Sequence, residues 1–496
     1  MVEAAANSVQ DHLIDGLSFK LKEGSTYVTD RRSITYHPSG SNIYSPMGTR
    51  LISIKLTGDN WMDPSTFRIM FDLVNTDTRD YGSFAAGACK TSVRPLGGPY
   101  AFFKRMRVLA GGVVLEDIDD FNRVSHMFSI LESSGSLANK DSEGFGNTFN
   151  LESFANGDQN IHMFSGVLQG ESQTVMFKPL CGILSQKKYI PLRYTPLTIE
   201  LELVSNEEDP VVSNFVTVSN NPVIDAGMFD VSNTIIRFTN INTTTKWTIQ
   251  NVQAKCDVIT LDSQLEEIYA SHLLSGKTLP INYSSYISQV QTINGNEKVR
   301  LNVTRSLTRL KACYVTLDKK LKTGTINNIG RKNWNDFYSP MSYANSARAV
   351  VADFVGSGYQ NANIDHRGIG TKHSEAGEFQ FQLQLGNKLY PEYPIRSHAE
   401  GYYQLRKSLG VQSNHLHSFD IKSNEYRNNK FILGIDYEKI LNSGFTGANT
   451  RIGDIMNIRF DHSSALPEAN RADLLYVVLQ SDCILEITGS GVNVLD

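Results

Sequence analysis

Two histidines at alternate positions are the residues best placed for metal chemistry in this sequence. His415 and His417 are separated by one residue, and Asp420 follows three residues later. On a strand both imidazoles would lie on one side, and two histidines with a carboxylate form a common metal-binding set. Such a site needs further ligands, but Glu425 is off the expected spacing and His462 lies in a different setting. We therefore expect a polar loop or an interface here, with metal binding by His415 and His417 as the weaker alternative.

Other catalytic patterns are absent from the sequence. It contains no GxSxG nucleophile elbow, no GxxxxGK[ST] phosphate loop and no HExxH zinc motif. The glycine-rich stretches 97–99 and 356–358 lack the strand-to-helix context of a phosphate cradle. We expect that the chain is not an enzyme and that it has no catalytic residue, no cofactor-binding residue and no cofactor.

Four aromatic residues could stack on sugars or bases. Trp334 and Tyr338 occur in a polar stretch, and Tyr402 and Tyr403 are adjacent in a segment with helical periodicity. A tryptophan in a loop is more often buried than exposed, and the tyrosine pair suits the packing of a helix against a sheet. Sugar binding through Trp334 and Tyr338 is therefore a second alternative.

The charge balance argues against nucleic-acid binding. The chain has 47 basic and 51 acidic residues, and its basic clusters, such as 104–107 and 319–322, are short and dispersed. Holding nucleic acid through its phosphates needs clustered Lys and Arg.

No apolar run approaches the roughly 18 residues of a membrane span. We therefore expect no transmembrane segment, and from the charge balance no specific nucleic-acid site. The five cysteines are far apart and form no CxxC pair, which favours a reducing compartment.

The same pattern of strand, glycine turn, strand and helix occurs twice. Residues 107–116 form the first hairpin pattern, followed by a helical period over 119–133 with Asp119 or Asp120 as its N-cap. Residues 379–390 form the second, followed by a helix over 394–409 that begins with Pro394 in its first turn. Alternating apolar residues predict strands in most of the remaining chain. The sequence therefore predicts two similar all-β domains in tandem.

The domain limits follow from the positions of these patterns. We expect an extended N-terminal arm at 1–48, a first domain at 49–261, a helical connector at 262–276 and a second domain at 277–496. Each domain is interrupted by a long polar stretch, 205–232 in the first and 318–377 in the second. Long loops in compact β domains are usually functional.

Two longer segments carry a family resemblance. Residues 177–192 read FKPLCGILSQKKYIPL, and residues 385–397 read LGNKLYPEYPIRS, followed by YYQL at 402–405. Both resemble segments of double jelly-roll major capsid proteins, most of all those of polinton-like viruses and virophages, in the adenovirus-type capsid lineage.

The resemblance implies a fold and an assembly. The fold would be two tandem eight-stranded jelly-roll sandwiches, each with a short helix, joined by the helical connector. Three chains would form a pseudo-hexagonal homotrimeric capsomer in the shell of an icosahedral dsDNA virus. The partners would be neighbouring capsomers, penton proteins and minor capsid proteins, and the location would be the virion, after synthesis in the host cytoplasm or nucleus. The N-terminal arm has no basic tail, so we do not expect this chain to condense a genome.

Two other functions stay open beside the capsid interpretation. One is a carbohydrate-binding or host-attachment protein made of two sandwiches, which would expose Trp334 or Tyr338 on loop tips. The other is a bicupin-type metalloprotein, which would depend on His415, His417 and a third ligand.

Overall fold

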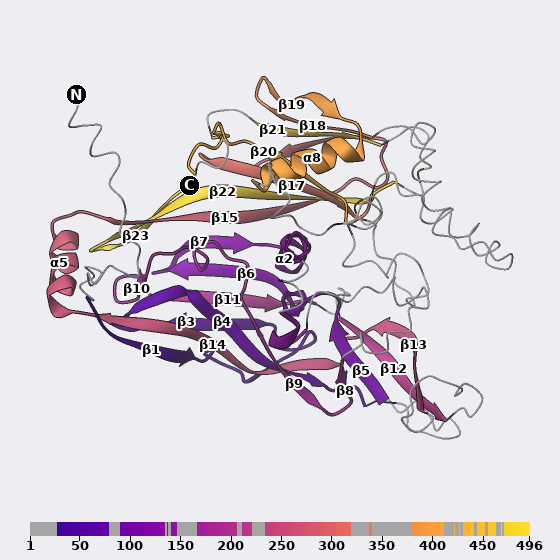
Figure 1. The fold of residues 1–496 in the computed structure, drawn as a ribbon, viewed down its shortest axis with the longest axis horizontal. Helices are drawn as coiled ribbons and strands as arrows, with labels where there is room; N and C mark the ends of the chain where they lie inside the picture. The colour runs from indigo at the N-terminus through magenta and orange to yellow at the C-terminus, as the bar shows by residue number, and fades with distance from the viewer. Residues whose placement is uncertain are drawn as a thin grey trace, which may run out of the picture.

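The protein is described by a computed structural model in which strands dominate (Figure 1). For residues 90–91, 141, 212–220 and 234–243 only the backbone is described. The described residues are 27–78, 90–133, 136, 140–145, 166–205, 211–220, 234–318, 337–339, 379–410, 421, 426, 430–440, 444–451, 455–462, 468 and 471–496.

The first half of the chain forms a sandwich of two antiparallel sheets. Sheet 1A has the order β1-β14-β4, with β9 and β10 paired to β4 and β2 paired to β14, and sheet 1B has the order β3-β11-β6-β7. The strands are β1 (Val28–Tyr36), β2 (Ile43–Tyr44), β3 (Leu51–Leu56), β4 (Trp61–Asn75), β6 (Phe103–Ala110), β7 (Val113–Ile118), β9 (Ser172–Phe177), β10 (Ile190–Pro191), β11 (Leu197–Leu203) and β14 (Trp247–Leu261).

The second half forms another sandwich. Sheet 2A has the order β15-β22-β17-β20, with β23 paired to β22, and sheet 2B has the order β16-β21-β18-β19. The strands are β15 (Leu279–Thr292), β16 (Lys298–Val303), β17 (Leu310–Asp318), β18 (Gln380–Leu385), β19 (Lys388–Ile395), β20 (Ile432–Asp436), β21 (Met456–Asp461), β22 (Leu474–Thr488) and β23 (Gly491–Leu495).

The two halves repeat one topology. In chain order, β1, β3, β4, β6, β7, β9, β11 and β14 correspond to β15, β16, β17, β18, β19, β20, β21 and β22, and corresponding strands have the same neighbours. A helix follows the hairpin in each half, α2 (Phe121–Ile130) in the first and α8 (His398–Ser408) in the second. The predicted duplication, with eight strands and one helix in each half, is confirmed.

Further elements lie outside the repeat. A sheet of the order β13-β12-β5-β8 extends the first half, and helix α5 links the two halves. Among the described residues, none of the helices is long and apolar enough to cross a membrane. These elements are β5 (Lys90–Pro95), β8 (Val167–Leu168), β12 (Val211–Asn220), β13 (Thr234–Thr243), α5 (Ser263–Leu274) and the short 3-10 helices η2 (Pro99–Phe102) and η3 (Asp141–Glu143).

Each sandwich has an aromatic core between its sheets. Fully buried Phe71 makes edge-to-face contacts with Phe102 and Phe103, both with ring centroids 5.8 Å away. In the second half Phe379 contacts Phe431 in the same geometry at 5.5 Å. Alternating burial along β11 reflects the side chains that point into this core. Figure 1 shows the four sheets in the order 2B, 2A, 1B and 1A from top to bottom, so 1B and 2A meet at a junction between the halves.

The start of the second helix differs from the sequence prediction. Pro394 lies in β19, and the helix begins after Ser397, whose hydroxyl accepts a hydrogen bond from the Glu400 N–H. The Glu400 carboxylate in turn accepts from the Arg396 N–H, which makes a reciprocal cap. Two capping hydrogen bonds therefore decide where the helix begins, and the expected role of Pro394 in its first turn is wrong.

Three other predictions need correction. Residues 28–36, expected in an N-terminal arm, form β1 and pair with β14 over its C-terminal part. The polar stretch 205–232 contains a strand, β12. In the connector, the helical spacing of Leu265, Ile268 and Tyr269 predicts one packed face on α5, but Ile268 is 62% exposed. β1 is the edge strand of sheet 1A, and its backbone pairing with β14 needs little burial of its side chains. β12 pairs on both sides, with β13 and β5, so backbone hydrogen bonds hold this polar stretch in a strand. The remaining domain limits, including the connector at 262–276 and the second domain at 277–496, stay predictions.

Candidate functional site at the junction of the two halves

The structure gives no support to a metal site built on the residues named from the sequence. His415, His417 and Glu425 lie outside the described residues. His462 is buried, its Nδ1–H donates to the Asn296 carbonyl at 2.9 Å, and its Nε2 accepts from the Ala472 N–H at 3.2 Å. Both ring nitrogens are thus used by the backbone. No group of three potential metal ligands occurs within the described parts of the chain.

The aromatic candidates separate into packed and exposed residues. Tyr402 packs edge-on against Tyr426 with ring centroids 5.1 Å apart, as predicted for a helix on its sandwich. Tyr403, its neighbour, is 63% exposed, so the expectation of packing is wrong for it. Tyr338 is partly buried against the core, and burial raises the pKa of its hydroxyl. Trp334 lies outside the described residues.

The most elaborate arrangement of polar groups lies where β7 and α2 of the first half meet sheet 2A. The Tyr283 hydroxyl of β15 donates to the Leu115 carbonyl of β7 at 3.0 Å. Farther along β15, the Ser288 hydroxyl donates to the Asp119 carbonyl. These hydrogen bonds join strands that are far apart in sequence, so they fix the position of one half against the other.

A glycine makes the closest approach at this junction. Gly182 lies in a turn closed by a hydrogen bond from the Ser185 N–H to the Gly182 carbonyl at 3.0 Å. A Cβ atom on Gly182 would lie 1.7 Å from the carbonyl oxygen of Ser284 in β15. No side chain fits in that space, so only glycine allows the two backbones to approach this closely.

A buried carboxyl group holds this turn in place. Glu116 of β7 is 2% exposed and accepts hydrogen bonds from the Cys181 thiol at 2.6 Å and from the Gly182 N–H at 2.9 Å. Burial raises the pKa of Glu116 from 4.5 to about 7, while the hydrogen bonds from Cys181, Gly182 and Ile183 oppose the increase. Glu116 therefore keeps its proton under mildly acidic conditions, which lowers the cost of burying it.

Burial also keeps the ionisable groups around Glu116 uncharged. Burial, followed by the nearby Glu116, raises the pKa of the Cys181 thiol. Burial likewise raises the pKa of Tyr283 and Tyr286 in β15. Neutral forms of all these groups are favoured, so the junction is held by hydrogen bonds between uncharged groups at this point.

The other end of the junction is held by a buried ion pair. Arg123 of α2 lies 3.1 Å from Asp318 at the end of β17, and the two side chains are 5% and 9% exposed. The guanidinium also lies 4.7 Å from the ring centroid of Phe337 and 4.9 Å from that of Tyr476. Removing one member of such a pair leaves an unpaired buried charge, which typically costs about 3–5 kcal/mol.

The residues of this site fix the position of the two halves relative to each other. Its groups are buried and protonated or paired, and they join two domains. No motif or periodic pattern in the sequence points to Glu116, Arg123 or Asp318. The motif at 177–192 was the only signal, because it contains the Cys181-Gly182 turn.

Comparison with known proteins identifies the fold. No protein-family model and no curated protein matches the sequence. Solved structures match over nearly the whole chain: a chain of the cryo-EM structure of the Sputnik virophage (9% identity, 98% of this chain and 93% of that one, TM-score 0.56) and the PBCV-1 virus capsid (10% identity, 97% and 100%, TM-score 0.52). The Faustovirus major capsid protein also matches (9% identity, 96% and 93%, TM-score 0.51).

The chain has a double jelly-roll fold. The duplicated strand order within the chain and the match in length to these structures agree on this point. The two sandwiches are accordingly called jelly roll 1 and jelly roll 2, and the junction joins sheet 1B of the first to sheet 2A of the second.

The close approach at Gly182 predicts a strong effect of one added methyl group. Gly182→Ala should lower the free energy of unfolding by at least about 3 kcal/mol, because the neighbouring backbone of Ser284 cannot move away without breaking β15 pairing. Urea denaturation at fixed protein concentration measures the change. Gly444→Ala is the matched control, since a Cβ there meets nothing within 4 Å. Equal stability of the two variants would contradict this account of the junction.

The raised pKa of Glu116 predicts a pH-dependent stability. Below pH 4.5 the group is protonated in both states, and between 4.5 and about 7 only the unfolded state releases its proton. Rising pH therefore favours unfolding, by roughly 3 kcal/mol in total for a group buried as deeply as this one. Above about pH 7 the ionisation of Glu116 lowers the free energy of unfolding no further.

Glu116→Gln removes this titration and isolates its contribution. Relative to the wild type, the stability of the variant should increase from pH 4.5 to about 7 and then stay level, as measured by thermal unfolding at each pH. Other titrating groups contribute equally to both proteins and cancel in the difference. Parallel stability profiles for the two proteins would show that folding does not raise the pKa of Glu116.

Proposed function

We propose that this chain is a major capsid protein, the structural subunit of the shell of an icosahedral dsDNA virus. The observation that carries the proposal is the agreement in fold, over nearly the full length of both chains, with the Faustovirus major capsid protein and with the PBCV-1 virus capsid. The buried, non-catalytic character of the junction supports a structural role. The chain would act by binding copies of itself.

The duplicated topology supports a trimer as the assembly unit. Each chain supplies two jelly rolls of the same strand order, so three chains supply six similar domains. Six similar domains around an axis give a pseudo-hexagonal outline, which can occupy a lattice position with six neighbours. The rigid junction matters for this function, because the angle between the two jelly rolls must be the same in every copy.

The partners and the location follow from this role. The trimer would contact neighbouring capsomers, and penton and minor capsid proteins would complete the shell. The protein would be found in the virion after synthesis in the host cytoplasm or nucleus. Assembly would need neither a metal nor a cofactor, since hydrogen bonds and apolar contacts between protein surfaces supply its specificity.

The proposed function predicts the mass and shape of the purified protein. Light scattering should give about three chain masses, and negative-stain images of the same peak should show particles of pseudo-hexagonal outline. Obligate interfaces of roughly 2,000–5,000 Å² should keep the trimer intact on dilution. A protein that stays monomeric or dimeric at high concentration would refute the capsid function.

A further inference from the structure

A pocket lies at the end of the molecule that carries α5 (Figure 1). Its volume is about 230 Å³. Pockets for drug-sized ligands are larger, roughly 300–1,000 Å³, so this one has room for a single side chain or a small ion. Residues from the start of β4, from the turn after β10 and from one face of α5 line it.

The walls of the pocket are fixed by the fold. Trp61 of β4 pairs with Pro191 of β10 on one side and with Ile259 of β14 on the other. After β10 the backbone turns tightly, because the N–H groups of Tyr194 and Thr195 both donate to the Pro191 carbonyl, at 3.1 Å and 2.9 Å. A central strand and a tight turn therefore place the side chains of Trp61 and Tyr194 in one pocket.

Three aromatic rings line the pocket. They belong to Trp61, Tyr194 and Tyr269, and all three side chains are partly exposed. The ring centroids of Trp61 and Tyr269 are 4.9 Å apart, with the ring planes at 45°. The face of an aromatic ring attracts a cation within about 6 Å of the centroid. The Arg193 guanidinium already lies 6.0 Å from the Tyr194 centroid, at the limit of that range.

The charged residues of the pocket are mostly acidic. Three carboxylates line it against one cation, Arg193, and they belong to Asp59, Glu266 and Glu267. Within the parts of the chain that the structure describes, none of these four side chains has an ion-pair partner. The positive end of the helix dipole favours Glu266 in the first turn of α5, but it does not account for the other two carboxylates. The pocket therefore has an excess of negative charge.

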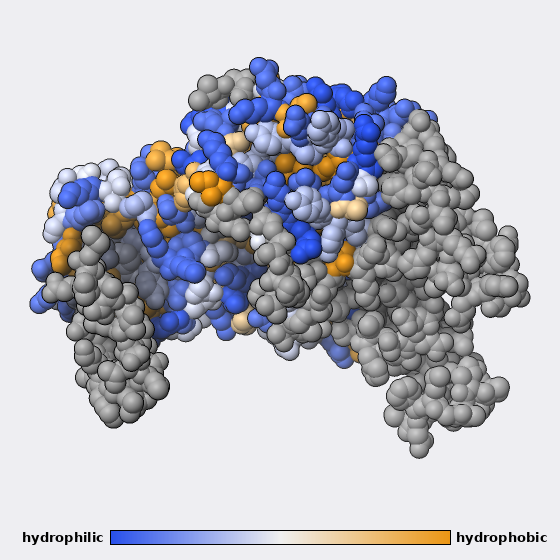
Figure 2. All heavy atoms as spheres, turned by 45° about the horizontal axis from the view of Figure 1, so that its top comes forward, coloured by the Kyte–Doolittle hydropathy of each residue, from blue (hydrophilic) through white to orange (hydrophobic). Residues whose placement is uncertain are grey.

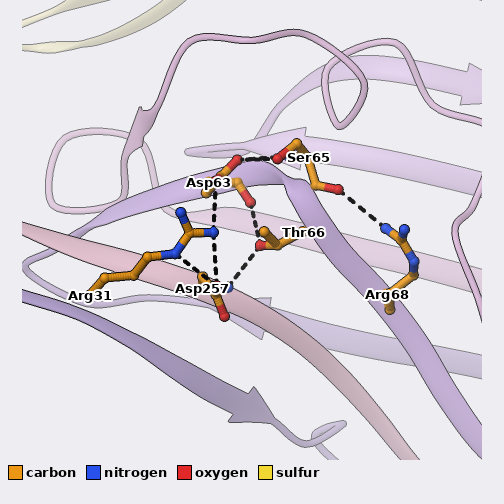
Figure 3. A network of polar contacts seen from close by, with 6 residues as sticks. All are labelled: Arg31, Asp63, Ser65, Thr66, Arg68 and Asp257. Atoms are coloured by element: carbon orange, nitrogen blue, oxygen red, sulfur yellow. Dashed lines mark hydrogen bonds and ion pairs between the residues drawn. The ribbon is translucent and has the colours of Figure 1, made fainter. Parts of the chain in front are cut away.

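A neighbouring pair of carboxylates shows the contrast. Arg31 of β1 lies 2.9 Å from Asp257 of β14 and 3.3 Å from Asp63 of β4, so one guanidinium joins three strands (Figure 3). Asp63 is two residues from Trp61 in β4 and also accepts from the Ser65 hydroxyl at 2.6 Å. We call these residues the Arg31 network. The chain balances the carboxylates of this network with its own cation, whereas those of the pocket stay unpaired.

An exposed apolar side chain continues the pocket along α5. Residues at intervals of three and four lie on one face of a helix, and here they are Ser263, Glu267, Ala270 and Leu274. Leu274 is 87% exposed. In Figure 2 the left-hand end of the molecule, where α5 lies, shows apolar residues beside polar ones. From Glu267 to Leu274 the helix rises about 10.5 Å, which an extended peptide spans with about three residues.

We propose that this pocket binds an arginine side chain in an extended segment of a partner protein, and that an apolar residue about three positions away packs on Leu274. A guanidinium suits the pocket better than an ammonium group, because its planar face stacks on aromatic rings while its N–H groups donate to carboxylates. The acidic lining repels the phosphates of nucleic acids and lipids. The inference does not depend on the proposed function, since every part of the pocket belongs to one chain.

Synthetic peptides test the proposal on the full-length protein. The probes are capped, fluorophore-labelled peptides with the central sequence Arg-Ser-Ser-Leu or its reverse, because the pocket does not fix the direction of the bound chain. Fluorescence anisotropy should show saturable binding of at least one of them with a Kd below about 1 mM. Replacing the arginine by citrulline, which keeps the shape but removes the charge, should weaken binding at least about tenfold.

Variants of the protein then locate the binding site. Glu266→Gln combined with Glu267→Gln should weaken binding of the arginine peptide at least about tenfold, because both carboxylates line the pocket. Glu171→Gln combined with Glu392→Gln is the matched control, since it removes the same charge at two exposed positions outside the pocket. Leu274→Ser should weaken binding of the peptide with leucine and leave binding of a peptide with serine in its place unchanged.

The outcomes separate the proposal from its alternatives. Equal affinity for the arginine and citrulline peptides, or equal affinity of the pocket variant and its control, overturns it, as does the lack of saturable binding. An unchanged Tm in each variant shows that lost binding is not lost folding. Lys20 and Lys22 are other cations in the sequence. Peptide binding that occurs only when both are changed to Gln shows that the chain fills its own pocket, and overturns the assignment to a partner.

Discussion

The contact between Gly182 and Ser284 is the constraint on which the arrangement of the two jelly rolls depends. A Cβ on Gly182 would overlap the Ser284 carbonyl at 1.7 Å, so the two backbones lie closer than any side chain at this position would allow. The Glu116 carboxyl group binds the same turn by accepting a hydrogen bond from the Gly182 N–H. The angle between the two halves is therefore set by backbone and buried polar atoms, which cannot adapt as flexible surface side chains can.

The duplication gives this junction a second consequence. When a chain contains two copies of one domain and packs a surface of the first on a surface of the second, one surface of each kind is left over. Arg123 and Asp318 are buried because their surfaces meet within the chain. Tyr393 and the Arg31 network occupy the surfaces that do not meet. Corresponding elements of the two halves are therefore exposed to different extents in the chain.

The sequence predicted the repeated architecture because the hairpins and strands have strong local patterns. The Gly111-Gly112 turn requires positive φ at both residues, and alternating residues such as those of β11 define the buried face of a strand. The start of α8 was misplaced because Pro394 fits a first helical turn equally well, and only the reciprocal cap between Ser397 and Glu400 decides the question. The strand β1 was missed because its side chains are largely exposed and carry no periodic apolar signal.

The residues of the junction were not predictable for a different reason. Glu116 lies in a strand where a charged residue normally points to solvent, and its burial results from contacts with a turn 65 residues later in the chain. Arg123 looks like an ordinary polar residue of an amphipathic helix until jelly roll 2 covers it. Neither local propensity nor periodicity contains that information, since it arises from how two domains pack.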